Sequence, residues 1–340
     1  MIFLILPALT AVVAALMTGS LRRYAIRAGL IDRPNSRSSH SIPTPRGGGL
    51  AIVVTSLAAM GLLLGLHSLS LRLFAALAGG GLAVAVVGFI DDRYTIPARI
   101  RIAVHGCAAA WCLACLGGLP PLLIGHHVVQ LGWFGYVLGT VAIVWVLNLF
   151  NFMDGIDGIA ASEAIFVTCA GAVLGSIPPT ADALTAAIVG AACTGFLAWN
   201  WPPAKIFMGD VGSGYLGFVI AVLALAATRS NPVAIWVWLI LGGTFFVDAT
   251  VTLLRRTLQG ERVHEAHRSH AYQWLARRWG NHLPVTLSVL ALNVLWLFPA
   301  AWLAVNNPPL AIWIVAAAYA PLIILAIAAG AGRPEQRIPK

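Results

Sequence analysis

Five aspartates concentrate the scarce negative charge of this chain in three short polar segments. Asp91 and Asp92 are adjacent, and Asp154 and Asp157 are three positions apart. Asp210 stands in a glycine-rich stretch, and only 12 of the 340 residues are acidic. Crowded carboxylates repel one another and lose hydration on burial, and a bound cation removes both costs. Because carboxylates without cysteine favour hard ions, these segments predict a Mg²⁺ site, with Mn²⁺ as the alternative.

The segment NFMDGIDGIA, residues 151–160, carries two of these aspartates. If it is helical, Asp154 and Asp157 share one face. Gly155 then lets a ligand approach the backbone, and Asn151 adds an amide one turn earlier. A polar loop with turn glycines is the other interpretation of the same pattern.

The segment NWPPAKIFMGDVGSG, residues 200–214, brings Asp210 to the start of a predicted span. Backbone N–H groups at a helix N-terminus bind phosphate well. Lys205 in this loop is the only lysine besides the terminal Lys340. The alternative is an ordinary turn.

A histidine segment, residues 262–273, has His264, His267 and His270 at a spacing of three, with Arg268 among them. On a helix these side chains form one ridge that suits zinc or an anionic phosphate, whereas a solvated loop is the alternative. Magnesium, phosphate-binding backbone and basic side chains are the recurring parts of phosphoryl transfer. At a membrane face, one substrate would be a lipid phosphate and the other a soluble nucleotide compound.

Long apolar runs position these segments. The chain is 59% hydrophobic and 10% charged, whereas a soluble domain carries about 25% charged residues. In lipid only helices or closed barrels satisfy their own backbone, and long non-alternating runs favour helices. We therefore predict one all-α polytopic membrane domain over residues 1–340. Its eleven or so spans are expected at 2–20, 47–66, 73–90, 102–122, 132–149, 159–177, 182–199, 212–228, 233–253, 284–305 and 310–330.

Charge sets the orientation. With the N-terminus outside, every lysine and arginine except Arg72 and Arg229 falls in an inner segment, and the C-terminus is cytoplasmic. The candidate site then lies at the cytoplasmic face. The net charge of +9 follows from these inner loops, so we expect contact with membrane lipids and no nucleic acid partner.

The motifs resemble those of the polyprenyl-phosphate N-acetylhexosamine-1-phosphate transferases, a family of bacterial inner-membrane enzymes. The resemblance runs nearly the whole chain, in the family's order. It is carried by PTPRGGGLA (residues 43–51), GFIDDR (88–93), NLFNFMDGIDGIA (148–160), NWPPAKIFMGDVGSG (200–214) and the histidine segment. The form HEAHRSHAYQ is most similar to the branch that initiates O-antigen synthesis.

The resemblance implies a reaction and a set of roles. A phosphate oxygen of undecaprenyl phosphate attacks the β-phosphorus of a UDP-N-acetylhexosamine, and UMP leaves. Asp210, Asp91 and Asp92 would hold Mg²⁺. The expected catalytic residues are Asp91, Asp92, Asp154, Asp157, His267 and His270. The expected substrate-binding residues are Arg46, Asn151, Gly155, Ile156, Asn200, Lys205, Phe207, His264 and Arg268.

Two departures concern the substrate. Arg268 and Ser269 separate His267 from His270, whereas the peptidoglycan branch has consecutive histidines. The first loop has Ser41 and Ile42 where that branch carries a lysine before its Thr-Pro. Both argue against a muramoyl-pentapeptide substrate.

Three other functions fit less well. An ion-coupled transporter would carry its acids near the bilayer midplane, and here they lie toward one surface. A CDP-alcohol phosphotransferase needs further aspartates spaced by four after Asp157, and an intramembrane aspartyl protease needs a glycine where Phe207 stands. Asp248, inside a predicted span, has a structural role or lines a lipid groove. The sequence leaves a monomer and a homodimer both open.

Overall fold

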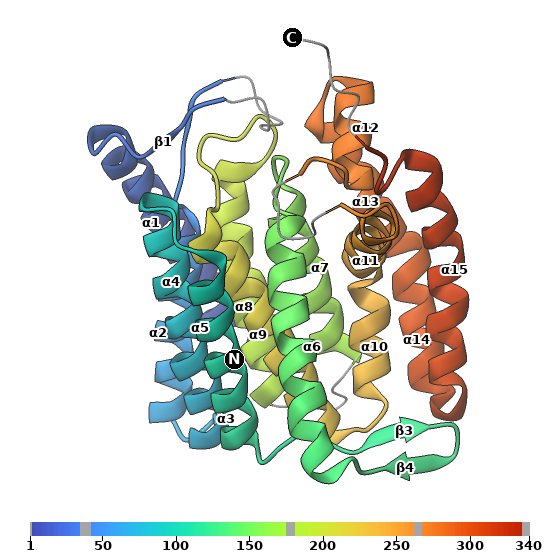
Figure 1. The fold of residues 1–340 in the computed structure, drawn as a ribbon. Coiled ribbons are helices and arrows are strands. Elements are labelled where there is room, and N and C mark those ends of the chain that lie inside the picture. Colours follow the sequence, from blue (N-terminus) through green and yellow to red (C-terminus); the bar gives the residue numbers. More distant parts are fainter. Residues whose placement is uncertain (1, 35–41, 175–180, 262–266, 335–340) are drawn as a thin grey trace.

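A computed structural model describes residues 2–34, 42–174, 181–261 and 267–334. In Figure 1 the long helices stand side by side, with the polar segments gathered at the top of the view, called here the site end. The helices of the first half are α1 (Ile2–Arg27), α2 (Gly49–Gly65), α3 (Leu71–Ala75), α4 (Gly81–Arg93), α5 (Ala98–Leu116), α6 (Gly132–Phe152) and α7 (Ile159–Leu174). Those of the second half are α8 (Ala181–Asn200), α9 (Asp210–Ser230), α10 (Ala234–Leu241), α11 (Gly243–Leu258), α12 (Ala271–Trp279), α13 (His282–Leu292), α14 (Phe298–Asn306) and α15 (Ala311–Ala329).

The prediction of an all-α polytopic membrane protein is confirmed. Within the described ranges, eight helical segments are long and apolar enough to cross a membrane. Two of them are interrupted by a π-helical turn, at Ala76–Gly80 between α3 and α4 and at Asn293–Leu297 between α13 and α14. The other three predicted spans coincide with the shorter helices α2 and α7 and with the pair α10 and α11. The total of eleven and the orientation remain predictions.

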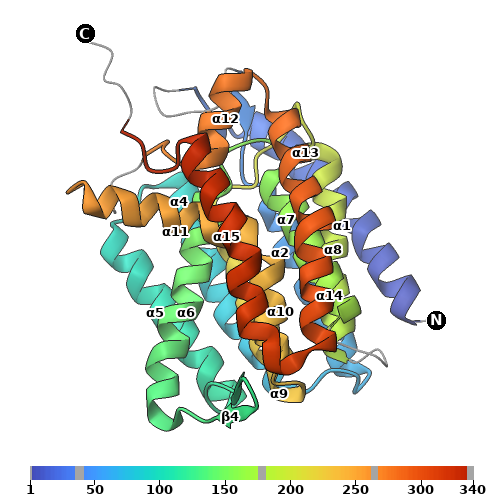
Figure 2. The ribbon, with the colours of Figure 1, turned by 90° about the vertical axis from the view of Figure 1, so that its right-hand side faces the viewer.

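The span predicted at 233–253 is broken into two helices. Helices α10 and α11 meet at Gly242 with a bend of 71°. Figure 2 shows α11 lying across the site end of the bundle, whereas α10 runs along it. Helix α11 buries three polar side chains, those of Asp248, Thr252 and Arg256, inside the protein. Such side chains would be costly on a helix that faced lipid.

Helix α9 is the centre of the bundle, with 94% of its apolar stretch buried. Glycines on its neighbours let other backbones come close, as small residues do in membrane helix packing. A Cβ on Gly88 of α4 would overlap the carbonyl of Asp210, and one on Gly49 of α2 would overlap Gly212. These contacts fix the start of α9, and hence Asp210, against α2 and α4.

Two small antiparallel ribbons complete the described structure. Strand β1 (Ile31–Asp32) pairs with β2 (Thr44–Pro45) at the site end. Strand β3 (Leu122–Ile124) pairs with β4 (His127–Val129) at the opposite end.

Candidate active site

The three aspartate segments meet at the site end, although more than a hundred residues separate the first from the last. Asp91 lies in the last turn of α4, Asp154 follows α6, and Asp210 begins α9. Packing of α9 against α4 and α6 therefore brings the carboxylates together, as the sequence predicted.

Arg101 of α5 joins two of these carboxylates. Its Nη1 lies 2.5 Å from Asp91 Oδ2 and 3.4 Å from Asp210 Oδ2. Asn151 Nδ2 donates to the same Asp210 oxygen at 3.3 Å, and the Ile96 amide donates to Asp91 Oδ1 at 2.7 Å. Asp91 and Asp210 are thus close enough to share one ligand. Arg101 could not be told apart from Arg99 by sequence, because only its ion pairs with Asp91 and Asp210 in the folded protein distinguish it.

Asp92 faces the N-terminus of α9. Its two carboxylate oxygens accept the amide N–H groups of Asp210 at 3.1 Å and Val211 at 3.2 Å. Gly209 has φ +77°, and a Cβ there would lie 2.5 Å from Asp92 Oδ2. Arg46 donates to the main-chain carbonyl of Asp92, which ties the first loop to the same place. Gly209 is the N-cap residue of α9, and the Asp92 carboxylate of α4 accepts the first two helical amides and so positions Asp210.

Asp154 lies in a loop, so the helical interpretation of residues 154–157 is wrong and the loop interpretation is right. Gly158 has φ +75°, which favours glycine and breaks the helix there. Burial raises the pKa of Asp154 well above its usual value, and the charges of Asp210, Asp92 and Asp157 raise it further. This crowd of carboxylates is an environment that a divalent cation stabilises.

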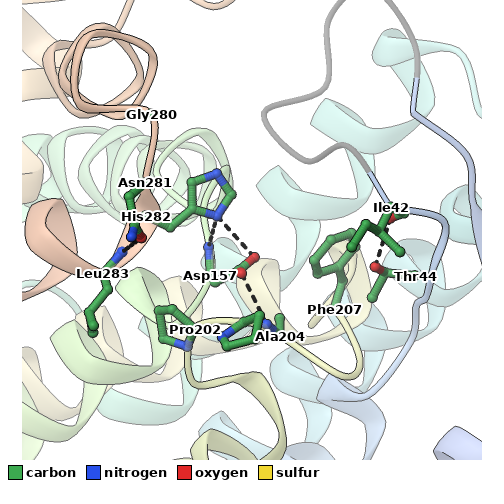
Figure 3. Close-up of a pocket in the computed structure, with 11 residues that line it drawn as sticks. Ile42, Thr44, Asp157, Pro202, Ala204, Phe207, Gly280, Asn281, His282 and Leu283 are labelled. Carbon is green, nitrogen blue, oxygen red and sulfur yellow. Dashed lines mark hydrogen bonds and ion pairs between the residues drawn. The ribbon is translucent and has the colours of Figure 1, made fainter.

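Asp157 also lines a polar pocket of about 400 Å³. Figure 3 shows it between His282 and Ala204, with Phe207 across the pocket. The Ala204 amide donates to Asp157 Oδ2 at 3.0 Å, and His282 Nδ1 lies 3.2 Å from Asp157 Oδ1. His282 also accepts the Asp157 amide N–H at 3.3 Å. His282 was missed because, two residues before a predicted span, it matched no motif.

The loop after α8 is held by its own side chains. Asn200 is 3% exposed, accepts the Gly158 amide at 3.0 Å, and donates to the Ile206 carbonyl at 3.0 Å. Ile156 is also buried, at 5% exposed. Lys205 Nζ lies 5.8 Å from the Trp199 ring centroid. Asn200 thus ties the loop to Gly158, and the contact of Asn200 and Ile156 with substrate remains a prediction.

The histidines do not form a helical ridge. His264 lies outside the described residues, and His267 and His270 precede α12 instead of lying on it. Their ring centroids are 5.0 Å apart, and His270 stacks on Phe152 and Tyr272. Burial, followed by the charges of His270 and Arg256, lowers the pKa of His267 to about 3. His267 is therefore neutral near pH 7 and offers hydrogen bonds to an anion, without a positive charge.

Asp248 holds this segment in place. Its carboxylate accepts the amide N–H groups of Ala271 at 2.8 Å and Tyr272 at 3.0 Å, the first two residues of α12. A Cβ on Gly155 would overlap the Tyr272 hydroxyl, so this contact brings α12 against the 151–160 segment. Asp248 has the structural role that the sequence left open.

The donor set near Arg101 fits Mg²⁺. In the described part of the chain, no group of three His, Cys, Asp or Glu side chains is arranged to hold a metal ion. Magnesium is commonly held by one or two carboxylates together with substrate phosphates and water. Asp91 and Asp210 offer such a pair, and Arg101 already lies between them as a cation.

The chain is similar to known proteins over most of its length. A sequence profile described as glycosyl transferase family 4 matches residues 74–228, which include all five aspartates. A Bacillus subtilis (strain 168) protein named as a probable undecaprenyl-phosphate N-acetylglucosaminyl 1-phosphate transferase is 31% identical over 269 residues. The match covers 76% of this chain and 73% of that protein. The chain belongs to the polyprenyl-phosphate N-acetylhexosamine-1-phosphate transferase family.

Other relatives of this transferase agree. A decaprenyl-phosphate N-acetylglucosaminephosphotransferase of Mycobacterium tuberculosis (strain ATCC 25618 / H37Rv) is 29% identical, over 88% of this chain and 81% of that protein. An undecaprenyl-phosphate alpha-N-acetylglucosaminyl 1-phosphate transferase of Yersinia pestis is 30% identical, over 75% and 72%. The protein is a multi-pass membrane enzyme, a glycosyl-1-phosphate transferase.

Proposed function

We propose that this transferase moves an N-acetylhexosamine-1-phosphate, of the N-acetylglucosamine type, from a UDP-sugar to undecaprenyl phosphate. The relatives' names support this substrate class. One structural observation carries it: Arg101 bridges Asp91 and Asp210 at one end of a bundle of apolar helices. A charged diphosphate and a lipid phosphate can meet only where these two environments adjoin.

The chain's own residues then divide the work. The nucleotide would occupy the 400 Å³ pocket, with its uracil on Phe207 and with Asp157 and His282 beside it. The diphosphate would extend toward Asp210, where Mg²⁺ bound by Asp91 and Asp210 would neutralise developing negative charge. Arg101 supplies a second fixed cation at that point, and Asp92 keeps Asp210 in place.

The bond changes are a direct displacement. A lipid phosphate oxygen forms a bond to the β-phosphorus, and the bond from that phosphorus to the bridging oxygen breaks. UMP leaves with the bridging oxygen. A phosphate dianion is already nucleophilic, so Asp91 and Arg101 contribute mainly orientation and charge balance.

The activity is tested with purified protein, undecaprenyl phosphate, Mg²⁺ and a panel of UDP-sugars, by measuring UMP and lipid-linked product. We expect product from UDP-N-acetylglucosamine or a close analogue, and none in EDTA. No UMP from any donor would refute the function, and full activity in EDTA would refute the metal.

We also propose that the site lies at the cytoplasmic face of the bacterial inner membrane and serves O-antigen or another envelope polysaccharide. The charge distribution supports this orientation. In a variant without its native cysteines, a cysteine placed at Lys205 should react with a membrane-impermeant maleimide in inverted vesicles only. Labelling in right-side-out vesicles alone would reverse the orientation.

A further inference from the structure

A smaller polar pocket, of about 130 Å³, extends from Asp210 into the bundle between α4, α5, α6 and α9. Arg101 and Asn151 line its outer end. His105 and Asn148 line it one helical turn deeper, on α5 and α6 respectively. The pocket is far smaller than the roughly 300–1,000 Å³ sites that hold whole small molecules, so it suits a single charged group.

His105 is the unexplained group in this pocket. It is 7% exposed, and its Nδ1 is buried without a hydrogen-bond partner in the described part of the chain. Burying an unpaired polar atom among membrane helices costs stability, so such an atom calls for a ligand or a function. His105 lies four residues after Arg101, and the two side chains share one face of α5.

Arg101 has donors to spare. Both of its ion pairs use Nη1, and its Nη2 and Nε carry no hydrogen bond to a described residue. A guanidinium offers five N–H groups in a planar fork that matches phosphate oxygens. Arg101 can therefore contact an anion in the pocket while it still bridges Asp91 and Asp210.

The pocket reaches the outside of the bundle between α5 and α6. Two of its liners are exposed there, Ile102 of α5 at 57% and Phe152 of α6 at 37%. These are apolar side chains on helices long enough to span a membrane. A group that enters here comes from the lipid side, whereas the Phe207 pocket opens among polar loops.

We propose that this pocket seats the phosphate monoester of the acceptor lipid, with His105 as a positioning residue that donates a hydrogen bond to it. The inference rests on the proposed function, because it names where that acceptor enters. The lipid chain would leave between Ile102 and Phe152. A phosphate oxygen would lie beside Asp91 and Asp210, on the opposite side from the nucleotide pocket.

Kinetics in His105→Leu and His105→Gln test this role. Loss of one hydrogen bond to a charged group should raise the KM for polyprenyl phosphate about tenfold or more in the leucine variant. The KM for the UDP-sugar should stay within about twofold of wild type, and glutamine should restore part of the loss. His127→Leu, which removes an exposed imidazole on β4, is the matched control and should change neither value. An unchanged acceptor KM in His105→Leu, or an equal rise for both substrates, would overturn the proposal.

A binding measurement separates this proposal from the reaction itself. Thermal unfolding in detergent is followed with polyprenyl phosphate, with the matching polyprenol, and with inorganic phosphate. Only the phosphorylated lipid should stabilise wild type, and His105→Leu should lose most of that shift. Equal stabilisation by the polyprenol or by inorganic phosphate would refute the seat. A protein that binds through His105 but transfers no sugar would refute the proposed function alone.

Discussion

Substitutions at Asp92 distinguish helix capping from metal binding, because capping needs hydrogen-bond acceptors whereas a metal ion favours a charged carboxylate. Its carboxylate accepts two amide N–H groups, at 3.1 and 3.2 Å, from the start of α9. Asparagine has a single acceptor oxygen and can keep only one of these two bonds, whereas alanine keeps neither. Because each lost hydrogen bond costs about 1 kcal/mol, we expect Asp92→Asn to lower the free energy of unfolding by about 1 kcal/mol, and Asp92→Ala by about 2 kcal/mol.

Activity should follow the same order. Without the cap, Asp210 shifts, and a displacement of about 1 Å costs about 100-fold in rate. Asp92→Asn should keep kcat within about tenfold of wild type, and Asp92→Ala should lose about 100-fold. Unfolding by denaturant in mixed micelles and UMP release measure the two effects. If Asp92→Asn is stable but as inactive as Asp210→Asn, then Asp92 binds the metal and the capping argument fails.

Three more substitutions test the electrostatics and the buried network. The raised pKa of Asp154 means that the folded state holds this proton more tightly than the unfolded state, so the free energy of unfolding should fall as pH rises above about 4. Asp154→Asn should lack this fall and be the more stable protein near pH 8. Equal pH profiles of the two proteins would contradict this expectation. Asp248→Ala should lower the free energy of unfolding by about 1–3 kcal/mol, and it should weaken donor binding because His270 is released. An unchanged free energy of unfolding would show that Asp248 does not cap α12. Glu163→Ala should lower the free energy of unfolding by about 1–3 kcal/mol, because Asn293 loses its 2.5 Å hydrogen-bond partner. The KM for the sugar donor should not change. A selective change in that KM would show a role in the site instead.

The helices and their common polar end could be predicted, because both follow from local composition. Apolar runs of sufficient length specify membrane helices, and the distribution of arginine places the loops on one side. The broken pair α10 and α11 was missed because its apolar run continues through Gly242 and Gly243. Only the tertiary environment, with Asp248 capping α12, turns α11 across the bundle.

The aspartates were found because their types and spacing carry the signal. Their partners were not, since Arg101, His105 and His282 belong to no spacing pattern and depend on which helices pack together. The contact of Asp92 with the start of α9 could not be predicted, because the sequence shows a carboxylate but not the two amide groups that it faces. The sequence could not decide between a helix and a loop at residues 154–157, because Gly155 and Gly158 are compatible with both. In the structure Gly158 has a positive φ and the segment is a loop.

We propose that Asp91 and Asp210 together hold a divalent ion against the donor diphosphate. The most direct measurement is UMP release by Asp91→Asn and Asp210→Asn proteins, at saturating Mg²⁺ and both substrates, in samples whose unfolding matches wild type. We expect that neither variant turns over above background. Near-wild-type rates in either folded variant would contradict it.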